Sequence, residues 1–316
     1  VARYESREKR LVPGSERLIG VTPMEALPLE QGSWRCVLRC PGFADAVVPV
    51  RIGRGGEWRQ DVTLYRPEEI PPGFVLVPGG PYAAGGAGDR GADPGPQVTV
   101  DFFASRLPVT TGEYVDFLND LAAAGRLEEA VVRQPREGAT PHVRLADARF
   151  EPASPGAAGA LLVSRDLPVM GISWHDAVAY CAWRSAREGR MVRLLHEREW
   201  EKAARGTDGR RYPWGDEDDA TFSNTNESLA GVPRIVPVGS FPADESPYGL
   251  RDMAGNMVSW CWNAPDVPYR DFCALRGGGW DHSRLHAECA TRLGFSHSAT
   301  FRRYGMRVCV PVMPHA

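Results

Sequence analysis

Lysine is almost absent from this chain of 316 residues, since only Lys9 and Lys202 are lysines. Arginine therefore carries nearly all of the positive charge, and the formal net charge is −3. Without a basic surplus the chain lacks the broad positive field that draws proteins to nucleic acid, so we expect no nucleic-acid partner. The excess of arginine over lysine favours a GC-rich genome and a thermophilic bacterial source.

Long apolar runs are also missing, and no stretch approaches the length that a membrane-spanning helix needs. The chain begins Val1-Ala2-Arg3, with neither a methionine nor the apolar segment of a secretion signal. We therefore expect a processed chain or the end of a longer protein whose upstream domain is missing here. We also expect a cytoplasmic location without membrane insertion, and display at a surface would need a partner.

The seven cysteines do not form a zinc-binding pattern. Cys36 and Cys40 are close in sequence, but no second cysteine pair or histidine cluster follows them. An odd number of scattered cysteines favours buried thiols in a reducing compartment over a disulfide framework.

Two parts of unequal size follow from the pattern of turns and apolar residues. Residues 1–70 contain four short strand candidates, separated by turns rich in proline and glycine. This pattern predicts a small, antiparallel β domain, either sandwich-like or a single appended sheet, joined by a proline-rich linker to a larger domain over residues 71–316. The four candidates are residues 18–22, 34–39, 47–52 and 58–64.

Helix starts in the larger part are marked by capping boxes, in which a serine or threonine precedes an acidic residue by three positions. One box pairs Thr110 with Glu113, and a second pairs Ser173 with Asp176. A third helix is predicted for residues 196–205, where Trp200, Ala203 and Ala204 fall on one face.

The segment from Arg276 to Arg307 differs from the rest of the chain. It opens with three glycines before Trp280 and closes with a Gly-Met-Arg triplet ending at Arg307. Residues 281–304 between them contain no lysine, asparagine, glutamine or proline, and they follow neither a helical nor a strand period. The flanks therefore predict a structural framework, and the interior predicts a displayed loop surface of the kind that carries function.

A series of motifs between residues 74 and 310 resembles the formylglycine-generating-enzyme (sulfatase-modifying factor) family. The resemblance implies an α+β fold, a loop-rich variant of the C-type lectin fold, preceded here by the small β domain. The motifs are Phe74-Val-Leu-Val-Pro-Gly-Gly80, residues 107–114, 167–177, 179–183 and 197–206, Tyr212-Pro-Trp-Gly215, residues 237–242, Tyr248-Gly-Leu-Arg-Asp-Met-Ala-Gly-Asn256 and the segment 276–307.

The oxidase members of this family bind copper through two cysteines that follow a glycine-rich turn, and thiolates are the soft ligands that Cu(I) needs. When the chain is aligned on Gly277 and Gly278, the first cysteine position holds His282 and the second lies near Ala287. Cys289 stands alone two residues further on. The resemblance therefore implies a chain without the oxidase cysteine pair, and we expect no enzyme activity.

A second branch of the superfamily contains iron-dependent sulfoxide synthases, which need a preceding helical domain with a histidine-rich iron site. Residues 1–70 contain no histidine and have a β pattern. His282 and His286 have the i, i+4 spacing of a helical metal site, but their stretch lacks helical periodicity. A metal-dependent oxidase of either branch stays the alternative hypothesis.

Calcium is a further possibility that the resemblance raises. Asn224 and Asp252 occupy family-like positions, whereas Ser259 replaces a carboxylate that looks like a calcium ligand in relatives. Calcium needs several oxygen ligands. We therefore expect no obligatory cofactor, and Asn224 and Asp252 are the candidate calcium ligands.

The chain is most similar to a third branch, the variable proteins of diversity-generating retroelements. Many of these have a lectin-like fold and carry a diversified segment at the carboxyl end, which here would cover about residues 276–308. Residues 290–292 and 305–307 keep the family spacing, while the residues between them depart from it. Adenine-directed mutagenesis of Asn codons yields the residue types found at 281–283 and 293–301. Drift in an inactive homologue would explain the same composition.

The resemblance thus predicts a non-enzymatic binding protein whose ligand is a protein or another macromolecule. Trp280 and the arginines Arg276, Arg292 and Arg307 are predicted to be framework residues, with the arginines donating hydrogen bonds to loop carbonyls. The predicted ligand-binding residues are Asp281, His282, Ser283, His286, Thr291, Leu293, Phe295, Ser296, His297, Phe301, Arg303 and Tyr304.

Overall fold

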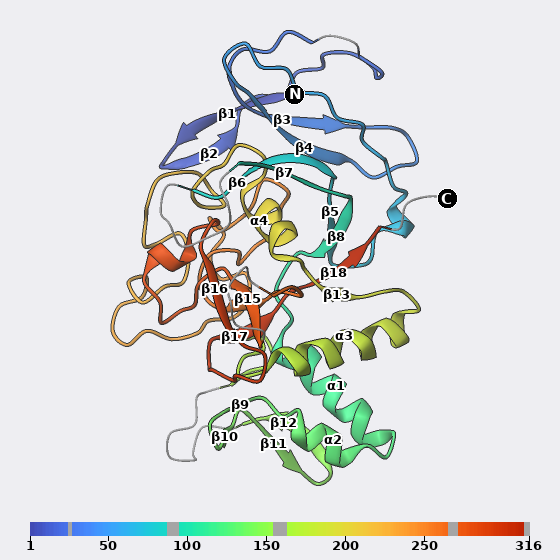
Figure 1. Cartoon of the computed structure of the whole chain (residues 1–316), viewed down its shortest axis with the longest axis vertical. Coiled ribbons are helices and arrows are strands. Elements are labelled where there is room, and N and C mark those ends of the chain that lie inside the picture. Colours follow the sequence, from blue (N-terminus) through green and yellow to red (C-terminus); the bar gives the residue numbers. More distant parts are fainter. Residues whose placement is uncertain (25–26, 87–94, 154–162, 265–270, 313–316) are drawn as a thin grey trace.

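The computed structural model describes residues 1–24, 27–86, 95–153, 163–264 and 271–312. Figure 1 shows three levels along the long axis of the molecule: an amino-terminal sheet, a central body of sheets and loops, and a level of helices and hairpins. No helix in these ranges is long and apolar enough to cross a membrane.

The amino-terminal sheet is antiparallel, with the strand order β2-β1-β3-β4. The strands predicted at 34–39 and 47–52 are confirmed as β3 and β4. The segments 18–22 and 58–64 are not strands. The described residues form a single sheet, which is the second of the two predicted forms, and not two packed sheets. Leu18 is 93% exposed, so its segment has no layer to pack against. The strands are β1 (Ala2–Arg7), β2 (Arg10–Pro13), β3 (Gly32–Leu38) and β4 (Ala46–Ile52).

Polar contacts join this sheet and the chain that follows it to the central body. The Leu11 amide donates to the Trp214 carbonyl at 2.7 Å, and the Tyr65 hydroxyl donates to Asp101 at 2.7 Å. Lys9 forms an ion pair with Asp219 at 2.8 Å. The sheet therefore docks on the body through its strand ends and the following loop.

Two four-stranded sheets form the body, in the orders β13-β18-β8-β5 and β16-β15-β14-β17. Arg307 lies between β17 and β18, where the chain passes from one sheet to the other. The first sheet is built from β5 (Phe74–Val77), β8 (Phe102–Ser105), β13 (Arg193–Leu194) and β18 (Val308–Pro311). The second is built from β14 (Val258–Trp260), β15 (Phe272–Arg276), β16 (Arg292–Ser296) and β17 (Tyr304–Met306).

The three predicted helices are confirmed, each with a reciprocal capping box at its start. Thr110 caps α1 (Thr111–Ala123), and Ser173 caps α3 (Trp174–Glu188). His196 caps α4 (Glu197–Arg205), whose Trp200 and alanines are buried as predicted. These caps satisfy amide groups that the first helical turn leaves unpaired.

The remaining elements are short. They are η1 (Pro67–Glu69), α2 (Leu127–Val132), η2 (Arg284–Ala287), and the hairpin strands β6 (Gly80–Ala84), β7 (Gly95–Thr99), β9 (Arg136–Glu137), β10 (Thr140–Pro141), β11 (Val143–Ala146) and β12 (Arg149–Pro152).

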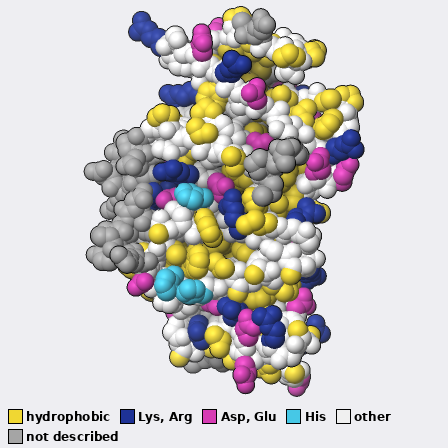
Figure 2. All heavy atoms as spheres, turned by 45° about the vertical axis from the view of Figure 1, so that its right-hand side comes forward, with side chains coloured by type: hydrophobic (Ala, Val, Ile, Leu, Met, Phe, Trp, Pro, Cys, Tyr) yellow, Lys and Arg dark blue, Asp and Glu magenta, His cyan; other side chains and the backbone are white. Residues whose placement is uncertain are grey.

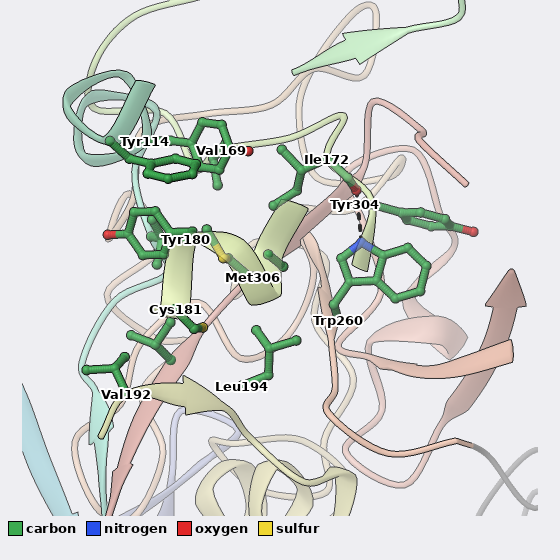
Figure 3. Packing of buried hydrophobic residues seen from close by; sticks show 14 of the residues in the cluster. Tyr114, Val169, Ile172, Tyr180, Cys181, Val192, Leu194, Trp260, Tyr304 and Met306 are labelled. Atoms are coloured by element: carbon green, nitrogen blue, oxygen red, sulfur yellow. Dashed lines mark hydrogen bonds between the residues drawn. The ribbon is translucent and has the colours of Figure 1, made fainter. Parts of the chain in front are cut away.

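The largest hydrophobic core connects the helices α1 and α3 to the second sheet (Figure 3). Tyr114 and Tyr180 stack with ring centroids 5.8 Å apart. Trp260 lies edge-on to Tyr304 and donates from its indole nitrogen to the Ile172 carbonyl at 2.9 Å. This core supports the sheet that carries the carboxyl-terminal segment.

Candidate functional site

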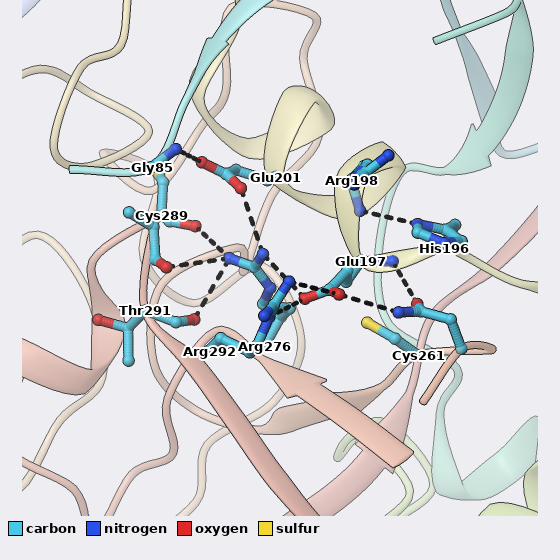
Figure 4. Close-up of polar contacts among 12 residues, drawn as sticks. Gly85, His196, Glu197, Arg198, Glu201, Cys261, Arg276, Cys289, Thr291 and Arg292 are labelled. Atoms are coloured by element: carbon cyan, nitrogen blue, oxygen red, sulfur yellow. Dashed lines mark hydrogen bonds and ion pairs between the residues drawn. The ribbon is translucent and has the colours of Figure 1, made fainter. Parts of the chain in front are cut away.

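Arg276 is the centre of a buried polar cluster beneath the carboxyl-terminal segment (Figure 4). Its side chain is fully buried, and one amino group donates to the carbonyls of Cys289 and Ala290, both at 3.1 Å. The other lies 3.2 Å from the carboxylates of Glu197 and Glu201 on α4. Burial opposes its charge, but Glu201 and Glu197 outweigh burial and raise the pKa of Arg276. The prediction of a framework role is confirmed.

Two other arginines also hold the segment, in different ways. Arg307 donates to the carbonyls of Ser105 and Arg251, and burial lowers its pKa to about 10, so it stays charged at neutral pH. Arg292 instead forms an ion pair with the Glu197 carboxylate, with one nitrogen–oxygen distance of 2.7 Å. The predicted carbonyl contacts are therefore confirmed for Arg307. For Arg292 the described hydrogen bonds run to a carboxylate, because α4 brings Glu197 beside it.

Trp280 is buried, as predicted for a core residue, and is 4% exposed. Its indole nitrogen donates to the Arg302 carbonyl at 3.4 Å, and the Arg302 guanidinium carbon lies 4.8 Å from its ring centroid. The run of glycines before Trp280 is also sterically constrained. A Cβ on Gly278 would meet the His286 carbonyl carbon at 2.8 Å. The start of the segment is therefore closely packed.

The polar residues among the predicted ligand contacts lie close to η2. Arg303 forms a bidentate ion pair with Asp281, with distances of 2.8–3.0 Å. The rings of His282 and His286 lie 4.8 Å apart, and the Ser283 hydroxyl is 3.2 Å from Nδ1 of His286. Burial, and next the charge on Arg303, lower the pKa of His282 to about 4, so this imidazole is neutral at physiological pH.

The apolar residues among the predicted ligand contacts form a second group on β16 and the turn after it. Phe295 is 40% exposed, stacks at 6.2 Å against Phe272 of β15, and meets Phe301 edge-on at 5.3 Å. Phe301 also lies 5.7 Å from the Arg303 guanidinium carbon, so the apolar and polar groups are neighbours. Figure 2 shows hydrophobic side chains gathered on one face between two patches of histidine. The half-exposed Phe295 and the nearby Arg303 are residue types that are enriched at protein interfaces.

His297 follows β16 and contacts a histidine that the sequence did not single out. Its Nδ1 lies 2.8 Å from Nε2 of His175 on α3. Its Nε2 lies 3.9 Å from the Asp271 carboxylate. Ser296 is close by, with its hydroxyl 3.1 Å from that of Ser298.

For two residues the prediction of a ligand contact is wrong, because their side chains are buried. Thr291 is 6% exposed and donates to the Leu285 carbonyl at 2.9 Å, so it holds η2 in place. Tyr304 is 3% exposed and packs on Trp260. The expectation of a loop without strand structure is also wrong for residues 292–296, which pair with β15. The other predicted contact residues, including Leu293, are at least partly exposed.

Residues far away in sequence complete this surface, and sequence reasoning missed them. Arg284 of η2 forms ion pairs with Asp218 at 2.7 Å and with Glu227 at 3.2 Å. Phe272 and His175 come from β15 and α3. No local pattern marks these residues, since their role depends on which loops the fold brings together.

The calcium candidates do not share a set of oxygen ligands in the contacts described. Asn224 is buried and donates to Asn256 and to the Arg234 carbonyl, which leaves its own Oδ1 without a hydrogen-bond partner in the described part of the chain. Asp252 accepts from the Gly239 amide at 2.7 Å, and burial raises its pKa. One unpartnered amide oxygen and one carboxylate that already accepts a backbone amide give no support for a cation with six or more ligands. Calcium binding stays a prediction.

The residues near the expected copper position also fit a soft metal poorly. His282 stands where the first cysteine of the oxidases is expected. Cys289 is fully buried, and burial raises the pKa of its thiol. A neutral, enclosed thiol is a poor metal ligand, because the thiolate is the form that binds.

A family model described as "Sulfatase-modifying factor enzyme 1-like domain" matches residues 59–312. The chain belongs to this family. The match begins before residue 70, where the sequence predicts a domain boundary, and that boundary stays a prediction.

Relatives of the chain within the family include an inactive protein as well as an enzyme. The chain is 32% identical over 270 residues to the "Inactive C-alpha-formylglycine-generating enzyme 2" of Mus musculus, which covers 75% of this chain and 85% of the relative. It is 32% identical over 251 residues to the "Formylglycine-generating enzyme" of Thermomonospora curvata, which covers 66% of this chain and 79% of that enzyme. Membership of the sulfatase-modifying factor family therefore does not by itself assign an activity.

The structure is similar to that of "Treponema denticola variable protein 1", with a TM-score of 0.52 and 17% identity over 75% of this chain and 94% of that one. At this identity the likeness concerns the fold. The predicted fold class, an α+β, loop-rich, C-type lectin-like fold of the formylglycine-generating-enzyme type, is confirmed.

Proposed function

We propose that this chain is a non-enzymatic binding protein that displays a diversified surface on a lectin-like scaffold, as the variable proteins of retroelements do. The ligand is a protein or another macromolecule. The contact surface consists of the exposed and half-exposed side chains between residues 281 and 303, and the buried arginines below it keep the backbone fixed.

The contrast between buried and exposed side chains within one segment supports this proposal. Arg276, Trp280 and Arg307 are buried and bound to distant parts of the chain, while Phe295 is half-exposed and the Asp281–Arg303 pair is partly exposed. A surface that must tolerate substitution needs framework contacts that do not depend on it. Backbone carbonyls are suitable partners for such a framework, because every substitution leaves them in place.

A matched pair of libraries tests the tolerance that the proposal requires. The first library randomises His282, Ser283, Phe295 and His297, and the second randomises Arg276, Thr291, Tyr304 and Arg307. We expect most members of the first library to fold and most members of the second to be lost, as measured by display level and protease resistance. Equal losses in both libraries would contradict the division between surface and framework.

Selection then tests binding itself. The first library is passed over immobilised lysozyme as the probe, and we expect binders whose changes lie in the randomised surface positions. The proposal fails if no binders emerge from a library that folds well. The DNA beside the gene gives an independent test, since the retroelement hypothesis requires a near-identical template repeat and a reverse transcriptase there.

The alternative function is a metal-dependent oxidase, which the identity to the Thermomonospora curvata enzyme favours. Purified protein is assayed for bound copper and iron by mass spectrometry and for oxidation of cysteine-containing peptides. We expect neither stoichiometric copper or iron nor turnover. Turnover that depends on added copper would establish the oxidase and overturn the proposal.

A further inference from the structure

His175 and His297 are 122 positions apart in the chain, but their ring nitrogens meet on the surface. Nε2 of His175 and Nδ1 of His297 are separated by 2.8 Å, and the ring centroids by 4.5 Å. The side chain of His297 is 35% exposed, and His175 is exposed in the first turn of α3. Both side chains therefore contact solvent.

The backbone fixes this pair from both sides. The Trp174 amide donates to the His297 carbonyl at 3.0 Å, and the His297 amide donates to the Asp271 carbonyl at 2.9 Å. These bonds hold the turn after β16 against the start of α3. The two imidazoles thus face each other because the fold places them there, and not because two flexible side chains met by chance.

Asp271 sets the direction of the hydrogen bond between the two imidazole rings. Its carboxylate lies 3.9 Å from Nε2 of His297, on the far side of the ring from His175. At this distance the carboxylate makes no hydrogen bond, but its negative charge favours the proton on Nε2 and leaves Nδ1 as the lone-pair donor. Nδ1 of His297 is then the acceptor, and Nε2 of His175 donates the hydrogen bond between the rings.

We propose that His175 and His297 form a surface site for a divalent first-row transition-metal ion, with Cu²⁺ bound more tightly than Ni²⁺ or Zn²⁺. Two neutral imidazoles suit these ions, and the Irving–Williams order sets the preference among them. The ion replaces the shared hydrogen, and the proton of His175 moves to its Nδ1. The nitrogens keep a spacing of roughly 2.8 Å, which metal–nitrogen bonds of about 2.0 Å require at adjacent positions of the tetragonal site that Cu²⁺ prefers.

The site is open, which distinguishes it from a structural metal centre. Within the described ranges no group of three or more His, Cys, Asp or Glu side chains could hold a metal ion. Water therefore fills the remaining positions, and a carboxylate or imidazole of a bound molecule can replace that water. Because Phe295 lies two residues before His297, the ion would sit at the edge of the apolar surface group. The metal site does not depend on the proposed function.

Titration of the purified full-length chain with CuCl₂, NiCl₂ and ZnCl₂ tests this site, with isothermal calorimetry as the measurement. We expect one ion per chain and the affinity order Cu²⁺ above Ni²⁺ and Zn²⁺. His175→Ala and His297→Ala should each weaken Cu²⁺ binding by more than about tenfold, since each removes one of two protein ligands. Asp271→Asn should cause a smaller loss.

The matched control variants are His282→Ala and His286→Ala, which remove the other close histidine pair of the surface. They should leave Cu²⁺ affinity within about twofold of the wild-type value. Thermal unfolding of all five variants checks that the fold is intact. If Cu²⁺ binding is absent from the wild type, survives in the His175 and His297 variants, or is lost in the control variants instead, the proposal is overturned.

Discussion

Arg276 and Arg303 lie in the same carboxyl-terminal segment, yet their ion pairs have opposite surroundings. Arg276 is fully buried between two carboxylates of α4 and the carbonyls of its own segment. Arg303 forms a bidentate pair with Asp281 near the surface, where the two side chains are 27% and 13% exposed. A buried charge cannot lose its partner without a large penalty, whereas a surface pair contributes little. The segment therefore combines residues that the fold fixes with residues that it leaves replaceable.

Of the framework residues, Arg276 should cause the largest loss of stability when it is replaced. Arg276→Met removes the shared cation between Glu197 and Glu201 and the donors to two buried carbonyls. We expect a loss of about 3–5 kcal/mol in the free energy of unfolding, measured by chemical denaturation. Arg303→Met is the matched control and should lose less, about 1–2 kcal/mol, because its bidentate pair with Asp281 is partly exposed. Equal losses would remove the distinction between the two arginines.

A glycine of the framework should be almost as intolerant. A Cβ on Gly305 would lie 2.1 Å from the sulfur of Met257 and 2.1 Å from the Val169 carbonyl oxygen. Gly305→Ala should therefore lower stability by about 1–3 kcal/mol through overpacking, as measured by the denaturation midpoint. Gly53→Ala serves as the control, because a Cβ there would meet nothing within 4 Å.

One buried and one half-exposed phenylalanine give a paired test of the same contrast. Phe102 of β8 is fully buried, and Phe102→Ala should lower the free energy of unfolding by about 3–5 kcal/mol. Phe295→Ala removes a half-exposed ring from the displayed surface and should cost about 1 kcal/mol. A larger loss at Phe295 than at Phe102 would show that the displayed side chain is part of the core.

Lys202 sharpens the comparison because it is a buried lysine whose hydrogen-bond partners, among the described residues, include no carboxylate. It donates to the carbonyls of Pro78 and Gly80 and to the Thr99 hydroxyl, and burial lowers its pKa from 10.5 to about 7. Between pH 7 and 10.5 the unfolded chain then holds a proton that the folded chain has lost. Stability should therefore rise with pH across this window, at a slope of at most about 1.4 kcal/mol per unit.

The measurement for Lys202 is the denaturation free energy of the wild type and of Lys202→Met at several pH values from 7 to 10. The difference between the two curves isolates this lysine from other groups. The three oxygen acceptors favour the ammonium form, so the observed slope should stay below the upper figure. A difference that does not change with pH would mean that Lys202 keeps its proton in the folded chain.

Local signals in the sequence were sufficient for the helices and for much of the framework. Thr110 and Ser173 each find their partner three residues away, so a capping box can be recognised without knowing the fold. The framework roles of Arg276, Trp280 and Arg307 followed from motifs shared with the family. In the amino-terminal part, by contrast, apolar runs predicted strands at 18–22 and 58–64 that have no partner strand. Pairing between strands is a property of the whole sheet.

The site could be predicted as a segment but not as a surface. Thr291 and Tyr304 have the composition of contact residues, but they are buried because η2 and Trp260 cover them. His175, Phe272 and Asp218 come from other elements, and nothing in their local sequence marks them. Which side chains face outward from a loop-rich segment depends on packing against distant chain.

The position of β18 has a consequence for biosynthesis. This strand lies inside the sheet β13-β18-β8-β5, and it follows the displayed segment along the chain. A ribosome must therefore make every displayed residue before that sheet can be completed and before Arg307 can reach the Ser105 carbonyl. A stop codon or a frameshift within the segment would leave the sheet without this strand, and such a chain would be exposed to proteolysis. Truncated chains would thus be removed before they accumulate.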